Sequence, residues 1–467
     1  MSTGFSKPAT LEAFVLEKMV TTRLPGLAFA LIEKGQVVHQ RGMGFTNLDR
    51  RNTPTEKTMF GIGSVTKVFT ALAVMQLREQ GKLDLEDPVG DYLGIPLLAR
   101  DEPIRIRHFL SHSSGIPALG FSESKMSRRW HTEGYPIGST ADLLTFMAGS
   151  ESWIHSEPGK RWAYLNEGYV LLGAIIEAAS GVPYTQYIKQ ALLEPLDMKR
   201  SHFERKIVEQ DENRVTPYMR DRDNKLFVGS NLYSDIPAAG GLVSTVEDLS
   251  KLTLALLNDG ITEDGVQIIE SESLSLMQTP AVEMTASETN LFPNQRGSCS
   301  IERFGLGLYL QEDFLGINVA GHGGGVMGST GHIAFAPKEG LGVVLQTNGH
   351  GYPMRQLTLA AIAHGLGLDF EDLPFIKLDR LLQRLTGSYR SFRDTMEAEV
   401  HRRGDNLELS IWMFNEDRKV WLTPESVTED HALFTTFSSG RSSPVEFIFS
   451  NERVDLLYER YAFRKTN

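Results

Sequence analysis

The sequence predicts an α/β fold, with an antiparallel sheet built from both chain ends and flanked by helices, followed by a small C-terminal all-β, barrel-like domain. A hairpin pattern near the start precedes a helical region, and strand patterns return at 304–310, 317–320, 333–336 and 342–347. From residue 387 onward, short runs alternate polar and apolar residues, as half-buried strands do. We therefore expect two domains, residues 1–372 and 373–467.

The first elements follow from local patterns. Gly26–Glu33 and residues 36–41 read as two strands, and Lys34-Gly35 supplies the tight turn of a hairpin. Before them, apolar residues recur at helical spacing and predict an amphipathic helix: Leu11, Phe14, Val15 and Met19. Residues 65–77 are almost wholly apolar, which predicts a buried helix, and 168–180 predicts another.

Composition excludes several function classes. The 467 residues carry 47 Lys+Arg against 59 Asp+Glu, a formal charge of −12. This acidic balance argues against a nucleic-acid binder and against attachment to an anionic membrane. A single cysteine, Cys299, permits no internal disulfide. With no membrane-length apolar run and no signal-peptide pattern, we expect a cytoplasmic protein without nucleic-acid or membrane partners.

The buried helix begins with the first candidate site, Ser64-Val-Thr-Lys67. Residues three apart share a helix face, so the Ser64 hydroxyl and the Lys67 amine can meet. A serine needs a proton acceptor to become a nucleophile, and burial disfavours a charged lysine. Ser122 and Lys125 match the same spacing within a polar run, where a solvated lysine would keep its proton.

Two further motifs could complete a site. Tyr164-Leu-Asn166 offers a phenol that can relay a proton and an amide that can orient a substrate. Residues 321–328 are glycine-rich and contain His322, and their backbone N–H groups could bind an oxyanion. Taken singly, each motif is also compatible with ordinary packing or a glycine-rich connection. A phosphate loop fits poorly, because no Gly-Lys-Ser/Thr follows.

Together, Ser64-x-x-Lys67, Tyr164-x-Asn166 and His322-x-Gly324 resemble the penicillin-recognising serine enzymes, and in particular the class C β-lactamase-related branch called the CubicO group. The resemblance extends over about residues 10–365 and implies a β-lactamase/transpeptidase-like catalytic domain. A catalytic domain of this family followed by a lipocalin-like barrel also resembles a self-compartmentalising archaeal protease. That likeness implies a homo-oligomer in which the barrel assists assembly and restricts access.

The resemblance implies a role for each motif residue. Ser64 is expected to be the acylated nucleophile, with Lys67 as proton acceptor or modulator and Tyr164 as general base. Asn166, His322 and Gly324 are expected to bind substrate. The backbone N–H groups of Ser64 and Gly325 are expected to form the oxyanion hole. The implied activity is cleavage of small esters, amides or peptides, including those with D-residues, without a metal or other cofactor.

One departure bears on the substrate. The third motif begins with His322, where true β-lactamases usually carry Lys or Arg, a permanent charge suited to the penicillin carboxylate. We therefore favour an esterase or peptidase over a β-lactamase or D-Ala-D-Ala carboxypeptidase. A catalytically silent scaffold or ligand sensor is the non-enzyme alternative. His108 and His112 are interpreted as packing residues, and no zinc-ligand spacing is evident.

Overall fold

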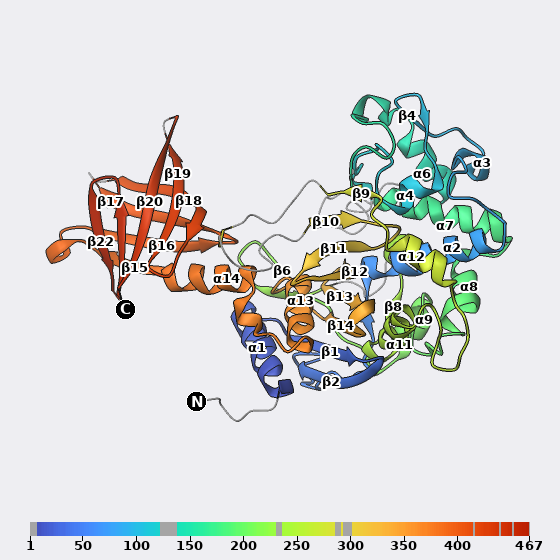
Figure 1. Cartoon of the computed structure of the whole chain (residues 1–467), viewed down its shortest axis with the longest axis horizontal. Helices are drawn as coiled ribbons and strands as arrows, with labels where there is room; N and C mark the ends of the chain where they lie inside the picture. Colours follow the sequence, from blue (N-terminus) through green and yellow to red (C-terminus); the bar gives the residue numbers. More distant parts are fainter. Residues whose placement is uncertain are drawn as a thin grey trace. The chain divides into compact units, whose positions relative to one another are not determined.

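A computed structural model describes residues 7–121, 138–229, 236–284, 291–292, 301–413, 416–438, 440–450 and 453–466. The chain divides into two compact units (Figure 1). The first, here the sheet unit, comprises Met1–Ala286, Ile301–Glu312 and Ile317–Leu368. The second, the barrel unit, comprises Ser287–Ser300, Asp313–Gly316 and Asp369–Asn467.

The sheet unit is built on eight strands in the order β2-β1-β14-β13-β12-β11-β10-β9. β1 from the N-terminal hairpin pairs antiparallel with the late strand β14, with Phe29 opposite Leu345. The predicted sheet from both chain ends is therefore confirmed. The strands are β1 (Gly26–Glu33), β2 (Gln36–Gly44), β9 (Val282–Glu283), β10 (Ile301–Phe304), β11 (Tyr309–Phe314), β12 (Ile317–Val326), β13 (Ser329–Ala336) and β14 (Leu341–Thr347).

Helices α11 (Val246–Leu257) and α13 (Met354–Gly365) cover opposite faces of this sheet (Figure 1). A Cβ atom placed on Gly342 would lie 2.8 Å from the Thr253 side chain of α11. A Cβ atom on Gly365 of α13 would lie 3.0 Å from the Leu341 side chain. Because neighbouring residues of a strand point to opposite faces, Leu341 and Gly342 of β14 assign one helix to each face.

Helix α2 (Thr66–Glu79) lies inside the sheet unit. Every residue from 66 to 75 is buried, as its apolar sequence predicts, and a short 3-10 turn, η1 (Gly63–Val65), leads into it. No helix among the described residues is long and apolar enough to cross a membrane. The other helices among the described residues of the unit, apart from α11 and α13, are α1 (Lys7–Thr22), α3 (Gly90–Leu93), α4 (Ile106–Leu110), α6 (Thr140–Met147), α7 (Asn166–Ser180), α8 (Tyr184–Ile188), α9 (Arg205–Gln210), α10 (Pro237–Gly240) and α12 (Ser271–Met277).

Short elements connect these helices. Three of them are two-stranded pairs: β3 (Phe60–Gly61) with β8 (Val243–Ser244), β4 (Leu98–Ala99) with β5 (Glu102–Pro103), and β6 (Tyr218–Arg220) with β7 (Leu226–Val228). The others are the 3-10 helices η3 (Ser150–Trp153) and η5 (Pro337–Glu339) and the π-helix η4 (Lys189–Leu193). The β3–β8 pair helps to position Ser64, because β3 directly precedes η1, which contains that residue.

One predicted strand is wrong. Residues 304–310 do not form a single strand, because β10 ends at Phe304 and β11 begins at Tyr309. Gly307 has φ +80°, and a Cβ there would lie 2.4 Å from the Ala71 side chain of α2. The chain thus turns where it passes close to the buried helix, and glycine permits both the turn and the approach.

The barrel unit contains eight strands closed in the order β15 to β22, which confirms the predicted all-β C-terminal domain. Its fully buried side chains are apolar or aromatic, with Leu407, Phe434 and Phe447 among them. Its elements are η6 (Phe370–Asp372), α14 (Pro374–Leu385), β15 (Gly387–Arg390), η7 (Phe392–Asp394), β16 (Glu397–Arg403), β17 (Asn406–Met413), β18 (Glu416–Val427), β19 (His431–Ser438), β20 (Arg441–Ser450), β21 (Arg453–Tyr458) and β22 (Tyr461–Lys465).

Candidate active site

The Lys67 amine stands at the centre of the candidate site. Its side chain is fully buried, and Nζ lies 3.0 Å from Ser64 Oγ. Nζ also donates to Asn166 Oδ1 at 2.7 Å and to the carbonyl oxygen of Ala239 at 2.6 Å. Three oxygens thus surround a nitrogen that, as an ammonium, has three hydrogens to donate. This arrangement matches the charged form of the lysine, because the three acceptors compensate the cost of burial, and it differs from the neutral amine that burial alone would favour.

The Tyr164 ring lies beside this amine. Lys67 Nζ is 5.0 Å from its ring centroid and 5.3 Å from that of Tyr169. Tyr164 ends the loop before α7, and Asn166 is the first residue of that helix. A cation close to a phenol favours the phenolate and so promotes release of its proton. The spacing Tyr-x-Asn therefore places the Tyr164 ring and the Asn166 amide next to the same lysine amine.

Residues 321–326 of the glycine-rich segment belong to strand β12, and residues 327 and 328 form the turn that follows it. A Cβ on Gly324 would lie only 1.9 Å from the carbonyl oxygen of Ile62 and 2.8 Å from the backbone nitrogen of Ser64. A Cβ on Gly63 would lie 2.4 Å from the backbone nitrogen of Gly325. These contacts leave no room for side chains. Glycine at these positions lets β12 run directly against η1, so the backbones of 63–64 and 324–325 are adjacent.

His322 presents a neutral imidazole to the site. Its side chain is 1% exposed, and Nδ1 lies 2.6 Å from the carbonyl oxygen of Gly323. Because a carbonyl only accepts, Nδ1 carries the hydrogen, and buried Nε2 keeps a lone pair with no hydrogen-bond partner among the described residues. Burial, and secondarily the Lys67 charge, lowers the pKa of His322 to about 3. At neutral pH this residue therefore contributes no positive charge.

Aromatic side chains surround these groups. The ring centroid of His322 is 5.1 Å from that of Tyr309 and 6.1 Å from that of Phe304. Trp162 lies 6.3 Å from Tyr164 and 6.5 Å from Tyr309. Burial raises the pKa of Tyr309 to about 12, so its phenol stays protonated. The candidate site is thus bordered by aromatic side chains, and the lower dielectric constant beside them strengthens the electrostatic effect of Lys67 on nearby groups.

The segment at residues 238–242 supports the nucleophile turn from behind. Thr70 Oγ1 donates to the Ala238 carbonyl at 2.7 Å, and Thr66 Oγ1 accepts from Leu242 N–H at 3.2 Å. Both threonines belong to the first turns of α2. They fix the position of the neighbouring Ala239 carbonyl, and so of the Lys67 amine.

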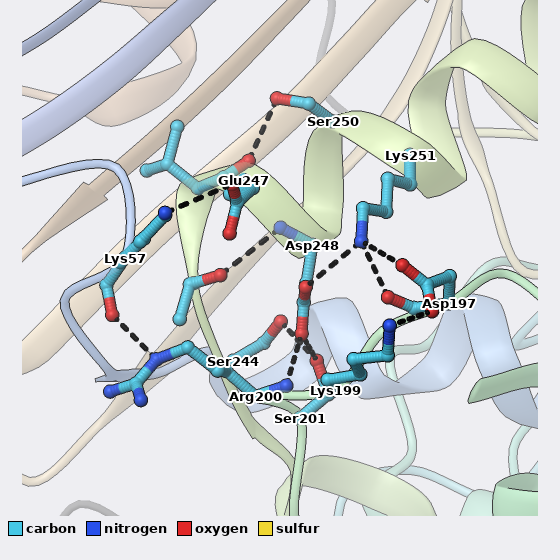
Figure 2. A network of polar contacts seen from close by, with 12 residues as sticks. Lys57, Asp197, Lys199, Arg200, Ser201, Ser244, Glu247, Asp248, Ser250 and Lys251 are labelled. Atoms are coloured by element: carbon cyan, nitrogen blue, oxygen red, sulfur yellow. Dashed lines mark hydrogen bonds and ion pairs between the residues drawn. The ribbon is translucent and has the colours of Figure 1, made fainter. Parts of the chain in front are cut away.

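A buried carboxylate anchors strand β8, which follows this segment, through the contacts drawn in Figure 2. Asp248 at the start of α11 accepts hydrogen bonds from the Arg200 N–H and the Ser201 hydroxyl, both at 2.8 Å. Ser201 Oγ lies 2.8 Å from Ser244 Oγ, and Lys251 Nζ lies 3.9 Å from the Asp248 carboxylate. Ser244 belongs to β8, which pairs with β3 immediately before η1. The network therefore fixes the strand that leads to Ser64.

The structure brings the residues predicted from sequence into one place. Ser64, Lys67 and Asn166 are joined by hydrogen bonds, and Tyr164 lies against the Lys67 amine. His322 lies 6.3 Å from Tyr164 between ring centroids, and Gly324 contacts η1. The competing pair Ser122 and Lys125, and Cys299, lie outside the described residues. Among the described residues no cluster of His, Cys, Asp or Glu could hold a metal ion.

Sequence reasoning missed other parts of the site. The Ala239 carbonyl has no sequence signal, because every residue carries a carbonyl. Tyr309 and Phe304 fell in a segment interpreted as one strand. His112, interpreted as packing, stacks on Tyr164 with ring centroids 4.0 Å apart. No spacing rule connects it to a tyrosine fifty-two residues later.

Two family models match the chain. A β-lactamase model matches residues 11–366, and the model of the Pab87 octamerisation domain matches residues 370–464. The octameric penicillin-binding protein homologue from Pyrococcus abyssi superposes with a TM-score of 0.90 and 36% identity, covering 98% of this chain and 100% of that one.

Two further relatives are more distant. Penicillin-binding protein 4* of Bacillus subtilis is 26% identical over 397 residues, which is 81% of this chain and 82% of that protein. The D-stereospecific amidohydrolase from Streptomyces sp. is 24% identical with a TM-score of 0.58, covering 76% of this chain and 98% of that one, and this likeness shows the shared fold. The family model spans most of the chain, and the resemblance read from the three motifs is confirmed: the chain belongs to the β-lactamase family.

Proposed function

We propose that the chain is a serine hydrolase that cleaves small amides, peptides or esters through an acyl-enzyme on Ser64. The observation that carries the proposal is the buried Lys67 amine, which contacts Ser64 Oγ and Asn166 Oδ1 and lies beside the Tyr164 ring. A buried cation has no structural benefit that an apolar side chain could not supply, and its burial is costly. Its retention next to a hydroxyl and a phenol favours a chemical role.

In the proposed mechanism, Lys67 remains an ammonium and stabilises the Tyr164 phenolate. The phenolate takes the Ser64 proton while Oγ attacks the substrate carbonyl. The resulting oxyanion accepts hydrogen bonds from the N–H groups of Ser64 and Gly325, each contributing about 3–4 kcal/mol. Tyr164 then passes its proton to the departing amine or alcohol. A water attacks the ester in the same way, returning its proton through Tyr164 to Ser64.

The neutral His322 bears on the substrate. At the position of His322, a carboxylate next to the scissile bond would meet a lone pair on Nε2 and not a positive charge. The D-Ala-D-Ala and penicillin carboxylates are therefore poorly matched, whereas a substrate N–H or hydroxyl could donate to Nε2. We accordingly place Asn166, His322 and Gly324 on the substrate side of the site and favour neutral esters and amides over β-lactams.

A labelling experiment tests the proposal. A fluorophosphonate should label Ser64, and turnover should rank p-nitrophenyl acetate and D- or L-aminoacyl anilides above nitrocefin. Ser64→Ala should lose both labelling and turnover, whereas the matched variant Ser122→Ala, which removes the competing Ser-x-x-Lys motif, should keep them. Nitrocefin as the best substrate would indicate a β-lactamase. Absence of labelling and turnover in the wild type would favour the silent scaffold.

We further propose that the barrel unit assembles copies of the chain. Its family model is an octamerisation domain, and the Pyrococcus abyssi homologue is octameric. Three exposed aromatic side chains come from consecutive strands of the barrel, namely Trp412, Trp421 and Phe437, at 60%, 59% and 76% exposure. Light scattering should show an oligomer that Trp412→Glu and Trp421→Glu shift to smaller species while Ser64 labelling is retained. A monomeric wild type would contradict this proposal.

A further inference from the structure

His112 holds the chain on both sides of Tyr164. Its carbonyl oxygen accepts a hydrogen bond from the Ala163 N–H at 2.7 Å. Its Nδ1 accepts one from the Leu165 N–H at 3.0 Å. The residue directly before and the residue directly after Tyr164 are therefore bound to one histidine. This fixes the backbone of the tyrosine from both directions.

The His112 ring also fixes the tyrosine side chain. The two ring centroids are 4.0 Å apart with an interplanar angle of 33°. Tyr169 and Phe304 border the other sides of the imidazole, each with its centroid 5.0 Å away. Because Tyr169 and Phe304 hold the imidazole in place, the Tyr164 ring has no space to rotate toward His112. The Tyr164 ring is thereby kept next to the Lys67 amine, with its centroid 5.0 Å from Nζ.

The backbone and the tautomer of His112 both suit this arrangement. Its φ is +53°, a left-handed conformation in which His and Asn are enriched among non-glycine residues. Since Nδ1 accepts a hydrogen bond, the hydrogen resides on Nε2, which is buried without a hydrogen-bond partner among the described residues. Burial, and then the Lys67 charge, holds the pKa of His112 well below its usual value. The imidazole therefore stays neutral and keeps accepting from Leu165.

We propose that His112 is a positioning residue that fixes the Tyr164 phenol beside Lys67 and Ser64. This inference rests on the proposed function of Tyr164. A histidine that only fills the core would need neither the two flanking hydrogen bonds nor the close ring contact with Tyr164, whose centroid is 4.0 Å away. The distinction is testable because a core role affects folding, whereas a positioning role affects the chemical step.

Three variants separate these roles in the full-length protein, with p-nitrophenyl acetate as substrate. His112→Ala removes the Nδ1 acceptor and the ring, and it should lower kcat by roughly 100-fold with little change in KM. His112→Asn keeps an acceptor at the same branch of the side chain and tolerates positive φ, so it should lie within roughly fivefold of wild type. His108→Ala is the control. His108 Nδ1 accepts from the N–H of Arg105, the residue directly before α4, and its loss should leave kcat unchanged.

A double-mutant cycle with Tyr164→Phe decides whether the effect passes through the tyrosine. In the Tyr164→Phe background, adding His112→Ala should change the residual turnover by no more than about twofold. Independent, multiplicative losses would overturn the inference while leaving the proposed function intact. Full activity of Tyr164→Phe alone would instead overturn the proposed function. Equal losses in His112→Ala and His112→Asn, matched by equal losses of thermal stability, would assign His112 to the core.

Discussion

The sheet unit and the barrel unit bury different kinds of side chain. In the barrel, Leu407, Leu409, Phe434 and Phe447 are fully buried and make an apolar core. In the sheet unit, Lys67, His112 and His322 are at most 1% exposed, Lys18 is 2% exposed, and they accompany a larger apolar core. Burying polar and ionisable groups costs free energy unless each is paired. We infer from this difference that the buried polar groups around Lys67 serve the proposed chemistry, whereas the apolar core of the barrel serves its stability.

The largest expected effect is the loss of turnover when Lys67 of the sheet unit is replaced, compared with a replacement in the barrel. Lys67→Met removes the amine from Ser64, Asn166 and the Ala239 carbonyl, so turnover should fall by at least about 1,000-fold, or about 4 kcal/mol. The matched barrel variant is Arg402→Met, which breaks the ion pair with Asp379 at 2.6 Å. Steady-state kinetics should show no loss in that variant. Retained turnover in Lys67→Met would show that the buried lysine of the sheet unit has no role in the chemistry.

A cavity in the barrel core should lower stability and leave the reactivity of Ser64 unchanged. Leu456 is fully buried, and Leu456→Ala should lower the free energy of unfolding of the barrel unit by about 3 kcal/mol. Leu456→Met, which nearly conserves volume, should cost less than about 1.5 kcal/mol. Urea unfolding followed by barrel tryptophan fluorescence measures both. Fluorophosphonate labelling of Ser64 in native buffer should be unchanged, and slower labelling would contradict the assignment of separate tasks.

Acid should destabilise the sheet unit through His322. Its pKa is about 3 in the folded chain and near 6.5 when unfolded, so the unfolded chain binds more protons between these values. The neutral His322 therefore makes its full contribution to the free energy of unfolding above pH 6.5. Between pH 6.5 and about 3, this free energy falls by about 1.4 kcal/mol for each unit by which the pH is lowered.

The variant His322→Asn should reduce the dependence of the free energy of unfolding on pH by about 1.4 kcal/mol per pH unit. Unfolding followed by hydrogen exchange of sheet-unit peptides at pH 7 and pH 5 provides the measurement. The barrel histidine His401, which is exposed, is the matched control, and His401→Asn should keep the wild-type slope. An unchanged slope in His322→Asn would show that His322 is not held neutral by burial.

The smallest effects are expected where the two units are alike, on their surfaces. The ion pair between Arg205 and Glu209 in the sheet unit is solvent-exposed, as is that between Arg390 and Glu397 in the barrel. Glu209→Gln and Glu397→Gln should each change the free energy of unfolding by no more than about 0.5 kcal/mol. A chemical denaturation series checks both. A loss several times larger in either variant would show that surface charges, too, distinguish the units.

Local patterns predicted much of this architecture. The buried helix after Ser64, the N-terminal hairpin and the alternating barrel strands were all readable, because each depends on the spacing of apolar residues within a short window. The same holds for Ser64 with Lys67, since one helical turn brings them together. Where two demands compete the pattern fails, as at Gly307, where the chain turns beside α2 within an apparently continuous strand.

The sequence by itself determined which side chains could react and that their motifs belong together. Only the tertiary structure decided that the Ala239 carbonyl would be the third acceptor of the Lys67 amine, that the Gly323 carbonyl would fix the tautomer of His322, and that His112 would flank Tyr164. The Ala239 and His112 contacts join residues remote in the chain, while the Gly323 contact depends on the path of β12. Such contacts form only when the whole core packs, so no local pattern encodes them.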